Sequence, residues 1–143
     1  QPALRGITGH DGRAMLAALR NGGINADEVQ YLNAHGTSTP LGDANETAAV
    51  KAALGDHARK IAVNSTKSMH GHLLGAAGGV EAAISMLALT HGVLPAGLNV
   101  QTPDPALKAN YVRETTQQTL RIVASNSFGF GGSNASLIFG AAR

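Results

Sequence analysis

Apolar residues recur at helical spacing in three segments of the chain, and a glycine follows each segment. We predict helices over residues 12–21, 43–54 and 71–90, which end at Gly22, Gly55 and Gly92. Asp11 stands where an N-cap residue belongs, directly before the first helix. The third helix is rich in alanine and glycine, so it is expected to pack closely against its neighbours.

Four short apolar runs lie between and after these segments and have the composition of strands. They are residues 29–33, 61–64, 120–125 and 135–139. A glycine-rich turn joins the last two, so we expect them to pair antiparallel. Pro95, Pro103 and Pro105 mark an irregular loop before the third strand. Strands that alternate with helices predict one α/β domain, residues 1–143, with helices packed in layers on a mixed sheet.

The longest apolar stretch, residues 73–90, has Glu81 at its middle and several glycines. It is too short and too interrupted for a membrane span, so we predict a buried helix and no membrane partner. A carboxylate in such a helix needs a lysine, a cation or backbone donors, because burying it without a partner costs roughly several kcal/mol. The alternative is that Glu81 simply faces solvent.

Composition and charge exclude several classes of function. The formal charge is +2, from 11 Lys/Arg against 9 Asp/Glu, which is too small an excess to indicate a nucleic-acid partner. No cysteine is present, so the chain has no disulfide, no thiolate metal site and no cysteine nucleophile of its own. No secretory signal opens the sequence, which favours a cytoplasmic location.

Three polar, glycine-containing segments each follow a predicted strand: residues 33–40, 64–72 and 126–134. Ligand sites of α/β folds gather at strand ends, so we expect the three to converge on one site. The last segment is not a dinucleotide-binding loop, because Asn134 stands where the third glycine belongs. His70 and His72 lack the spacing of a helical zinc pair, so no transition metal is expected. Taken singly, His35, His72 and Lys67 are more often ordinary surface residues.

In this order, the three segments resemble the C-terminal half of the β-ketoacyl-acyl-carrier-protein synthases, the condensing enzymes of fatty-acid synthesis. The segments that carry the resemblance are Asn33-Ala-His-Gly-Thr-Ser-Thr-Pro40, Ser65-Thr-Lys-Ser-Met-His-Gly-His72 and Asn126-Ser-Phe-Gly-Phe-Gly-Gly132. The sequence is most similar to the FabF-like, type II elongating branch. The resemblance implies the C-terminal half of a layered, thiolase-like α/β fold.

The resemblance also implies a reaction and its residues. That reaction is the decarboxylative Claisen condensation of an acyl thioester with malonyl carrier protein. His35 and His72 would donate hydrogen bonds to the enolate oxygen, and Lys67 would fix His72 or Glu81. Thr37 and Thr39 would bind the phosphopantetheine arm. The substrate side would further include residues 128–130, that is Phe128, Gly129 and Phe130. Phe130 would be a gate between glycines, with a core anchor as the alternative.

Cofactors and partners follow from the same resemblance. No cofactor is expected to bind tightly, and phosphopantetheine arrives as the arm of the acyl carrier protein. A structural monovalent cation is expected near Asn33, Ala34, Glu81, Ser125 and Asn126. The nucleophilic cysteine of the family lies in an N-terminal half that this chain lacks, so the chain alone is expected to be inactive. The expected partners are that half, the carrier protein and a second copy in a homodimer.

Two other functions compete with the enzyme. One is a noncatalytic chain-length or decarboxylating partner of a polyketide synthase. Such partners typically lose motif residues, whereas His35, Lys67 and His72 are all present here. The other is a structural interaction domain that retains only the fold.

Overall fold

A computed structural model describes residues 12–141, which form a five-stranded sheet with helices on both faces. The strand order is β4-β2-β1-β6-β7. The first four strands in this order run parallel, and β7 pairs antiparallel with β6. The strands are β1 (Tyr31–Asn33), β2 (Ala62–Asn64), β4 (Asn110–Tyr111), β6 (Ile122–Phe128) and β7 (Asn134–Gly140). The expected mixed sheet and the antiparallel final pair are therefore confirmed.

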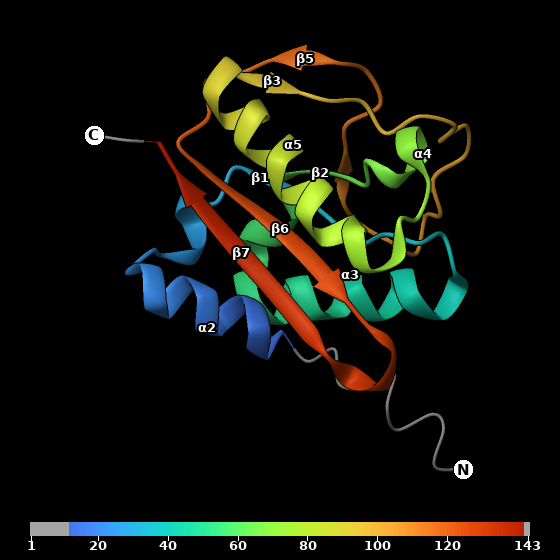
Figure 1. Ribbon diagram of the computed structural model, residues 1–143, viewed down its shortest axis with the longest axis horizontal. Helices are drawn as coiled ribbons and strands as arrows, with labels where there is room; N and C mark the ends of the chain where they lie inside the picture. Colours follow the sequence, from blue (N-terminus) through green and yellow to red (C-terminus); the bar gives the residue numbers. More distant parts are fainter. Residues whose placement is uncertain (1–11, 142–143) are drawn as a thin grey trace.

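The helices form a layer on each side of this sheet. Helices α2 (Arg13–Gly22) and α3 (Pro40–Leu54) cover one face, and α5 (Ala77–His91) covers the other. In Figure 1 the β6–β7 hairpin runs between these layers, with α5 on one side and α2 and α3 on the other. A one-turn helix, α4 (Lys67–His70), follows β2, and a small ribbon of β3 (Val93–Leu94) and β5 (Thr116–Gln117) follows α5.

The core is divided by the alternation of side chains along the strands. Leu32 and Val63 point to the face covered by α2 and α3, where Met15, Val50 and Leu54 meet them. The neighbouring residues on the same strands point to the other face, toward α5. Successive side chains of a strand point to opposite faces, so short strands supply both cores at once.

The helix starts differ from those that the sequence predicts. Helix α3 begins at Pro40 instead of residue 43, because proline is well suited to the first helical position, where its missing N–H costs no hydrogen bond. Helix α5 begins at Ala77 instead of residue 71. Gly71 (φ 76°) and Leu74 (φ 52°) have left-handed backbone conformations, which interrupt a right-handed helix. Asp11, the expected cap of the first helix, lies outside the described residues.

The strands differ mainly in length and number. Strand β6 continues three residues past the predicted end at Ser125 and ends at Phe128. Three two-residue strands, β3, β4 and β5, were not predicted, because their runs are too short to show alternation. They tie the loop after α5 to the sheet edge and to the start of the β6 segment.

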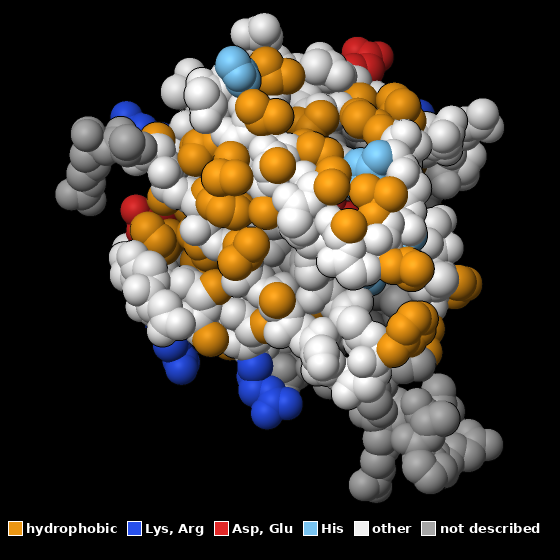
Figure 2. Space-filling view, viewed as in Figure 1, with side chains coloured by type: hydrophobic (Ala, Val, Ile, Leu, Met, Phe, Trp, Pro, Cys, Tyr) orange, Lys and Arg blue, Asp and Glu red, His pale blue; other side chains and the backbone are white. Residues whose placement is uncertain are grey.

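Helix α5 buries two polar residues and two alanines toward the sheet and exposes larger apolar side chains. The buried residues are Ala77, Glu81, Ser85 and Ala88, whereas Leu87 is 56% exposed. Residues Leu74–His91 are long and apolar enough to cross a membrane by length and composition, and 22% of this stretch is buried in the described chain. Figure 2 shows the hydrophobic side chains distributed over this face. The prediction of a buried helix is therefore wrong for the outer face of α5 in this chain.

Candidate active site

Three neighbouring strands end at the same edge of the sheet and deliver the site. Strands β1, β2 and β6 run parallel, with Asn33 beside both Asn64 and Ser125 at their last paired positions. The segments that follow carry His35 after β1 and Lys67 after β2, and Phe128 ends β6. The carboxyl ends of parallel strands form the usual ligand edge of an α/β sheet. The expected convergence of the three polar segments is thus seen in the structure.

His35 lies at the centre of this convergence. Its ring centroid is 5.5 Å from that of His72, edge to face, and 5.8 Å from that of Phe128. The three side chains come from the three different segments, so residues far apart in sequence share one small space. His35 is half-buried and His72 is exposed.

Lys67 forms a buried ion pair with Glu81 of α5, so of the partners expected for that carboxylate the structure has a lysine. Its ammonium nitrogen also lies 3.4 Å from His35 Nδ1. An ammonium only donates, so Nδ1 of His35 accepts and the neutral ring carries its proton on Nε2. Among the described residues Lys67 makes no hydrogen bond to His72, so of the two partners predicted for Lys67 the structure has Glu81.

His72 is held in the same tautomer by a different donor. The backbone N–H of Leu74 donates to His72 Nδ1 at 3.2 Å, so the neutral ring carries its proton on Nε2. Two neighbouring imidazoles, each with an Nε2–H donor, are suited to stabilise negative charge that develops on one substrate oxygen. Neither tautomer follows from the sequence; both follow from the partners of Nδ1.

Glu46 of α3 is a site residue that the sequence did not indicate. Its buried carboxylate accepts the backbone N–H groups of His35 at 2.9 Å and Gly36 at 2.8 Å. Asn126 Nδ2 donates to the same carboxylate at 3.3 Å. Burial raises the pKa of Glu46, and these donors and the charge of Lys67 oppose the rise. The residue therefore joins the His35 segment to α3 and to β6.

Thr37 and Thr39 follow His35 and share a hydrogen bond, with 3.2 Å between their hydroxyl oxygens. Between them, Ser38 has a left-handed backbone (φ 60°), and its N–H donates to the Asp43 carboxylate at 3.2 Å. Burial raises the pKa of Asp43, and this hydrogen bond opposes the rise. Gly42 lies against the pair, since a Cβ there would clash with Thr39 Oγ1. The threonine hydroxyls are thus held next to one another on a shaped loop.

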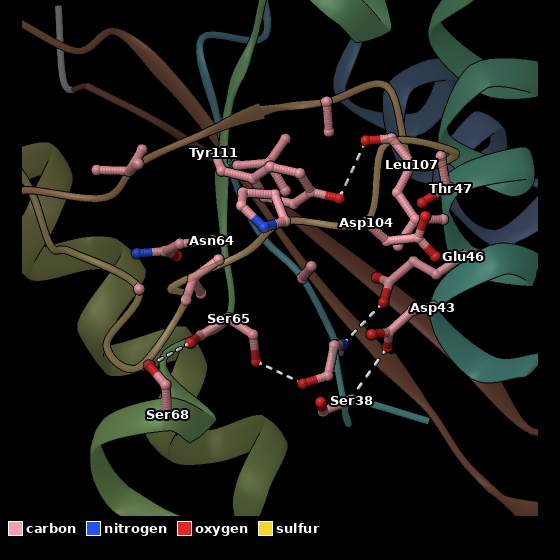
Figure 3. A pocket seen from close by; sticks show the side chains of 18 of the residues that line it. Ser38, Asp43, Glu46, Thr47, Asn64, Ser65, Ser68, Asp104, Leu107 and Tyr111 are labelled. Atoms are coloured by element: carbon pink, nitrogen blue, oxygen red, sulfur yellow. Dashed lines mark hydrogen bonds between the residues drawn. The ribbon is translucent and has the colours of Figure 1, made fainter. Parts of the chain in front are cut away.

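A cavity of about 900 Å³ opens beside these residues. Lys67, His72 and Thr37 line one part of it, and the loop of residues 97–112 lines another. Figure 3 shows Ser65 and Ser68 on one side of it and Asp43 and Glu46 of α3 on the other. His72 therefore borders a space large enough for a substrate arm, and His35 lies directly behind His72.

Phe128 and Phe130 have different surroundings. Phe128 ends β6, is half-buried and contacts the His35 ring, whereas Phe130 is 94% exposed. Gly129 has an ordinary backbone and donates its N–H to Ser133 at 2.7 Å, while Gly131 has φ 79°. In the described chain Phe130 is not a core anchor, so that alternative is wrong here. The gate remains a prediction.

The residues expected near a monovalent cation are buried: Asn33, Ala34, Glu81, Ser125 and Asn126. Glu81 Oε2 has no hydrogen-bond partner among the described residues, and a buried carboxylate oxygen of this kind fits a cation ligand. The side-chain oxygen of Asn33 accepts a hydrogen bond from the Thr66 N–H, and that of Asn126 accepts one from the Ser136 hydroxyl. Across residues 12–141 there is no cluster of three or more His, Cys, Asp or Glu suited to a metal ion.

Comparison with known proteins places this geometry in a family. Residues 6–101 match the family described as β-ketoacyl synthase, C-terminal domain. The chain belongs to the β-ketoacyl synthase family. This β-ketoacyl synthase domain is 51% identical over 130 residues to the mitochondrial 3-oxoacyl-[acyl-carrier-protein] synthase of Arabidopsis thaliana. It is 48% identical over 139 residues to 3-oxoacyl-[acyl-carrier-protein] synthase 2 of Synechocystis sp..

The domain covers only part of these relatives. The alignments include 88% and 96% of the chain but 28% and 32% of the two relatives. Among solved structures, a β-ketoacyl synthase from Burkholderia phymatum is similar with a TM-score of 0.86 and 38% identity, over 92% of this chain and 32% of that one. A type II polyketide ketosynthase in complex with its acyl carrier protein is similar with a TM-score of 0.89 and 33% identity, over 94% of this chain and 34% of that one. The expected thiolase-like fold is confirmed.

Proposed function

We propose that this domain is the C-terminal part of a 3-oxoacyl-[acyl-carrier-protein] synthase of fatty-acid elongation. The observation that carries the proposal is the edge-to-face pair of His35 and His72, with their ring centroids 5.5 Å apart and Lys67 beside His35. The names of the relatives support the same activity. This chain has no cysteine. The cysteine that would hold the acyl group therefore belongs to another part of the protein.

The reaction divides between the two parts of the protein. When malonyl thioester loses carbon dioxide, the electron pair of the broken carbon–carbon bond forms an enolate on the thioester. The Nε2–H groups of His35 and His72 stabilise the negative charge on the enolate oxygen. The enolate carbon then attacks the acyl thioester carbonyl, and the cysteine leaves as a thiolate. The ammonium group of Lys67 lies beside His35, and the ion pair with Glu81 fixes the position of this group.

Thr37 and Thr39 are proposed to bind the phosphopantetheine arm of the carrier protein. Their hydroxyls are adjacent and lie on the segment that leads from His35 to the surface. The similar ketosynthase in complex with its carrier protein supports this partner. No tightly bound cofactor is needed for this chemistry. A monovalent cation beside Glu81 is a structural addition, which the unpartnered Oε2 supports.

The rest of the protein is proposed to cover the outer face of α5. This face exposes Met86 (46%) and Leu87 (56%), while the side toward the sheet holds the paired Glu81. A helix with apolar residues outward is stable when another layer covers it. The relatives supply the chain for such a layer, since this domain spans about a third of their length. We therefore propose that α5 contacts the rest of the protein and not a membrane. A cytoplasmic location and a homodimer are further proposals, and the small net charge of +2 supports the proposal of no nucleic-acid partner.

The rival function is a chain-length partner that does not condense. A ketosynthase/chain-length factor is similar in structure, with a TM-score of 0.88 and 34% identity. The intact histidine pair and the Lys67–Glu81 ion pair favour the catalytic function. A purely structural domain has no use for the matched tautomers of His35 and His72.

Malonyl decarboxylation by the full-length protein tests the proposal. We expect His35→Ala and His72→Ala each to lose roughly 10²-fold or more in decarboxylation rate, the usual effect of removing one oxyanion donor. The exposed His91→Ala is the matched control, with an unchanged rate expected. A full-length protein that forms no ketoacyl product from acyl and malonyl carrier protein would refute the proposal.

A further inference from the structure

His70 is a titratable residue beside the catalytic machinery that the proposed mechanism does not use. It ends α4, between Lys67 and His72 in the chain, and it is half-buried. Its Nδ1 lies 2.7 Å from the carbonyl oxygen of Gly71, and its Nε2 lies 3.2 Å from the hydroxyl of Thr66. A carbonyl only accepts, so Nδ1 of His70 carries the proton, and the neutral Nε2 accepts from Thr66.

These two bonds belong to a longer chain of hydrogen bonds. Thr66 is fully buried, and its hydroxyl accepts from Asn33 Nδ2 at 3.0 Å. The same amide group lies 3.4 Å from the backbone carbonyl of Glu81. The Thr66 hydroxyl has two acceptors within reach, His70 Nε2 at 3.2 Å and Asn33 Oδ1 at 3.3 Å. When it donates to His70, donation runs from Asn33 through Thr66 and His70 to the Gly71 carbonyl. His70 thus connects the buried Thr66 to the Gly71–His72 turn.

The Gly71 carbonyl is the point at which this chain acts on the site. That carbonyl belongs to the peptide group that enters His72, so its direction sets where the His72 backbone begins. Gly71 caps the C-terminus of α4, where its N–H donates to the Lys67 carbonyl at 2.8 Å, but its φ of 76° and ψ of 179° turn its own carbonyl out of the helix, a conformation open to glycine. The His72 side chain is exposed, and its one hydrogen bond among residues 12–141 is the one from Leu74. The turn thus needs an outside restraint.

We propose that His70 is a positioning residue, which fixes the Gly71–His72 peptide through its Nδ1–H and so holds the His72 ring toward His35. The inference rests on the proposed function, because it concerns the donor role of His72. It predicts that the bond to Gly71 matters more than the imidazole itself.

Three variants in the full-length protein separate the two ring nitrogens. His70→Asn keeps an N–H near the position of Nδ1, His70→Gln keeps a polar group near Nε2, and His70→Ala keeps neither. We expect His70→Asn to decarboxylate malonyl carrier protein within about threefold of wild type. We expect His70→Gln and His70→Ala to lose about tenfold or more in kcat with little change in KM, since displacement of a catalytic group by about 1 Å costs up to roughly 10²-fold.

The controls distinguish failure of this inference from failure of the function. His91 is an exposed histidine at the end of α5, and His91→Ala should decarboxylate at the wild-type rate. If wild type decarboxylates and His70→Gln and His70→Ala do so equally well, the positioning role is overturned. It is also overturned if His70→Asn falls as far as His70→Ala, or if the losses follow a fall in melting temperature. A wild-type protein without decarboxylase activity overturns the proposed function itself.

Discussion

At the scale of residues, a buried carboxylate sets the shape of the site without touching the reaction. Glu46 collects the N–H groups of His35 and Gly36, the first two residues after Ala34, and so turns the chain at the end of β1. It also receives Asn126 from β6. Removing it would leave two backbone donors without a partner in a half-buried loop, which costs roughly 1–3 kcal/mol for each buried group.

The raised pKa of Glu46 gives a pH-dependent stability with a definite sign. Burial raises this pKa, so the folded protein binds the proton more tightly than the unfolded chain does. The contribution is fully present below the unfolded pKa of about 4.3 and is lost as the pH rises through the folded pKa. Relative to Glu46→Gln, wild type should therefore become more stable as the pH falls from neutrality. Denaturant unfolding of the full-length protein over a pH series measures the difference.

The exposed Glu114→Gln provides the matched control for this titration. Its free-energy difference from wild type should change much less over the same pH series. A difference for Glu46→Gln that is constant with pH, or that grows in the opposite direction, contradicts the assignment.

The two phenylalanines of the last loop should respond differently to truncation. Because Phe130 is 94% exposed, Phe130→Ala should change stability by about 0.5 kcal/mol or less and slow acyl transfer more than decarboxylation. Phe128→Ala should lower stability, because Phe128 is half-buried and packs on His35. Thermal unfolding and the two partial rates of the full-length protein measure this. A large loss of melting temperature in Phe130→Ala would make Phe130 an anchor in the whole protein.

A site residue was predictable from the sequence only where its own chemistry requires a partner. The partner of Glu81 was predictable because a carboxylate in an apolar helix requires one, and Lys67 is that partner. Glu46 was not, because in sequence it is one charge on an ordinary helix. It becomes buried only when the His35 segment folds back over α3, which is a tertiary event. The tautomers of the histidines depend on such contacts as well.

At the scale of elements, the close approach of two segments requires a glycine. Gly36 has φ 35°, and a Cβ there would lie 2.6 Å from the Cβ of Ser65, the residue after β2. Ser65 also donates its hydroxyl to the Gly36 carbonyl at 2.8 Å. The segments after β1 and β2 are thus in direct contact, which brings His35 to Lys67.

Gly36→Ala should separate these segments. We expect a loss of about 1–3 kcal/mol in unfolding free energy, the usual cost of overpacking, and a clear fall in malonyl decarboxylation as His35 moves. Gly55→Ala is the matched control, because Gly55 has φ 59° but a Cβ there meets nothing within 4 Å. It should cost stability through backbone strain alone and leave the rate unchanged. Equal decarboxylation rates in the two variants would contradict the role of the close contact.

The elements themselves were predictable where a local signal decides them. Helices α2 and α3 have apolar residues at helical spacing and end at glycines. Strands β6 and β7 are joined by a glycine-rich turn, which indicates an antiparallel pair. The start of α5 was placed too early because Leu73 and Leu74 continue the apolar stretch of the helix, although Gly71 and Leu74 have left-handed backbone conformations. The short strands β3, β4 and β5 form only because a neighbouring strand offers backbone partners.

At the scale of the whole molecule, the outer face of α5 predicts where the rest of the protein lies. In the full-length protein, Leu87→Lys should lower the unfolding free energy by at least about 3 kcal/mol, through lost apolar burial and a buried charge. Ala48→Lys, at an exposed position of α3, is the matched control and should be nearly neutral. Urea unfolding measures both. Equal stabilities would show that this face stays open to solvent and that the rest of the protein does not cover it.

The arrangement of strand ends also has a kinetic consequence. The three side chains His35, His72 and Phe128 are together only after β1 has paired with both β2 and β6, and β6 follows the whole of α3, α4 and α5 in the chain. Contacts between such distant segments form late, because closing long loops costs entropy before the contacts offset it. We therefore expect partially folded forms of this domain to contain helices but not the complete site. During refolding, the ability to decarboxylate should return with the slowest phase, after most helical signal has recovered, so activity reports the closure of the sheet.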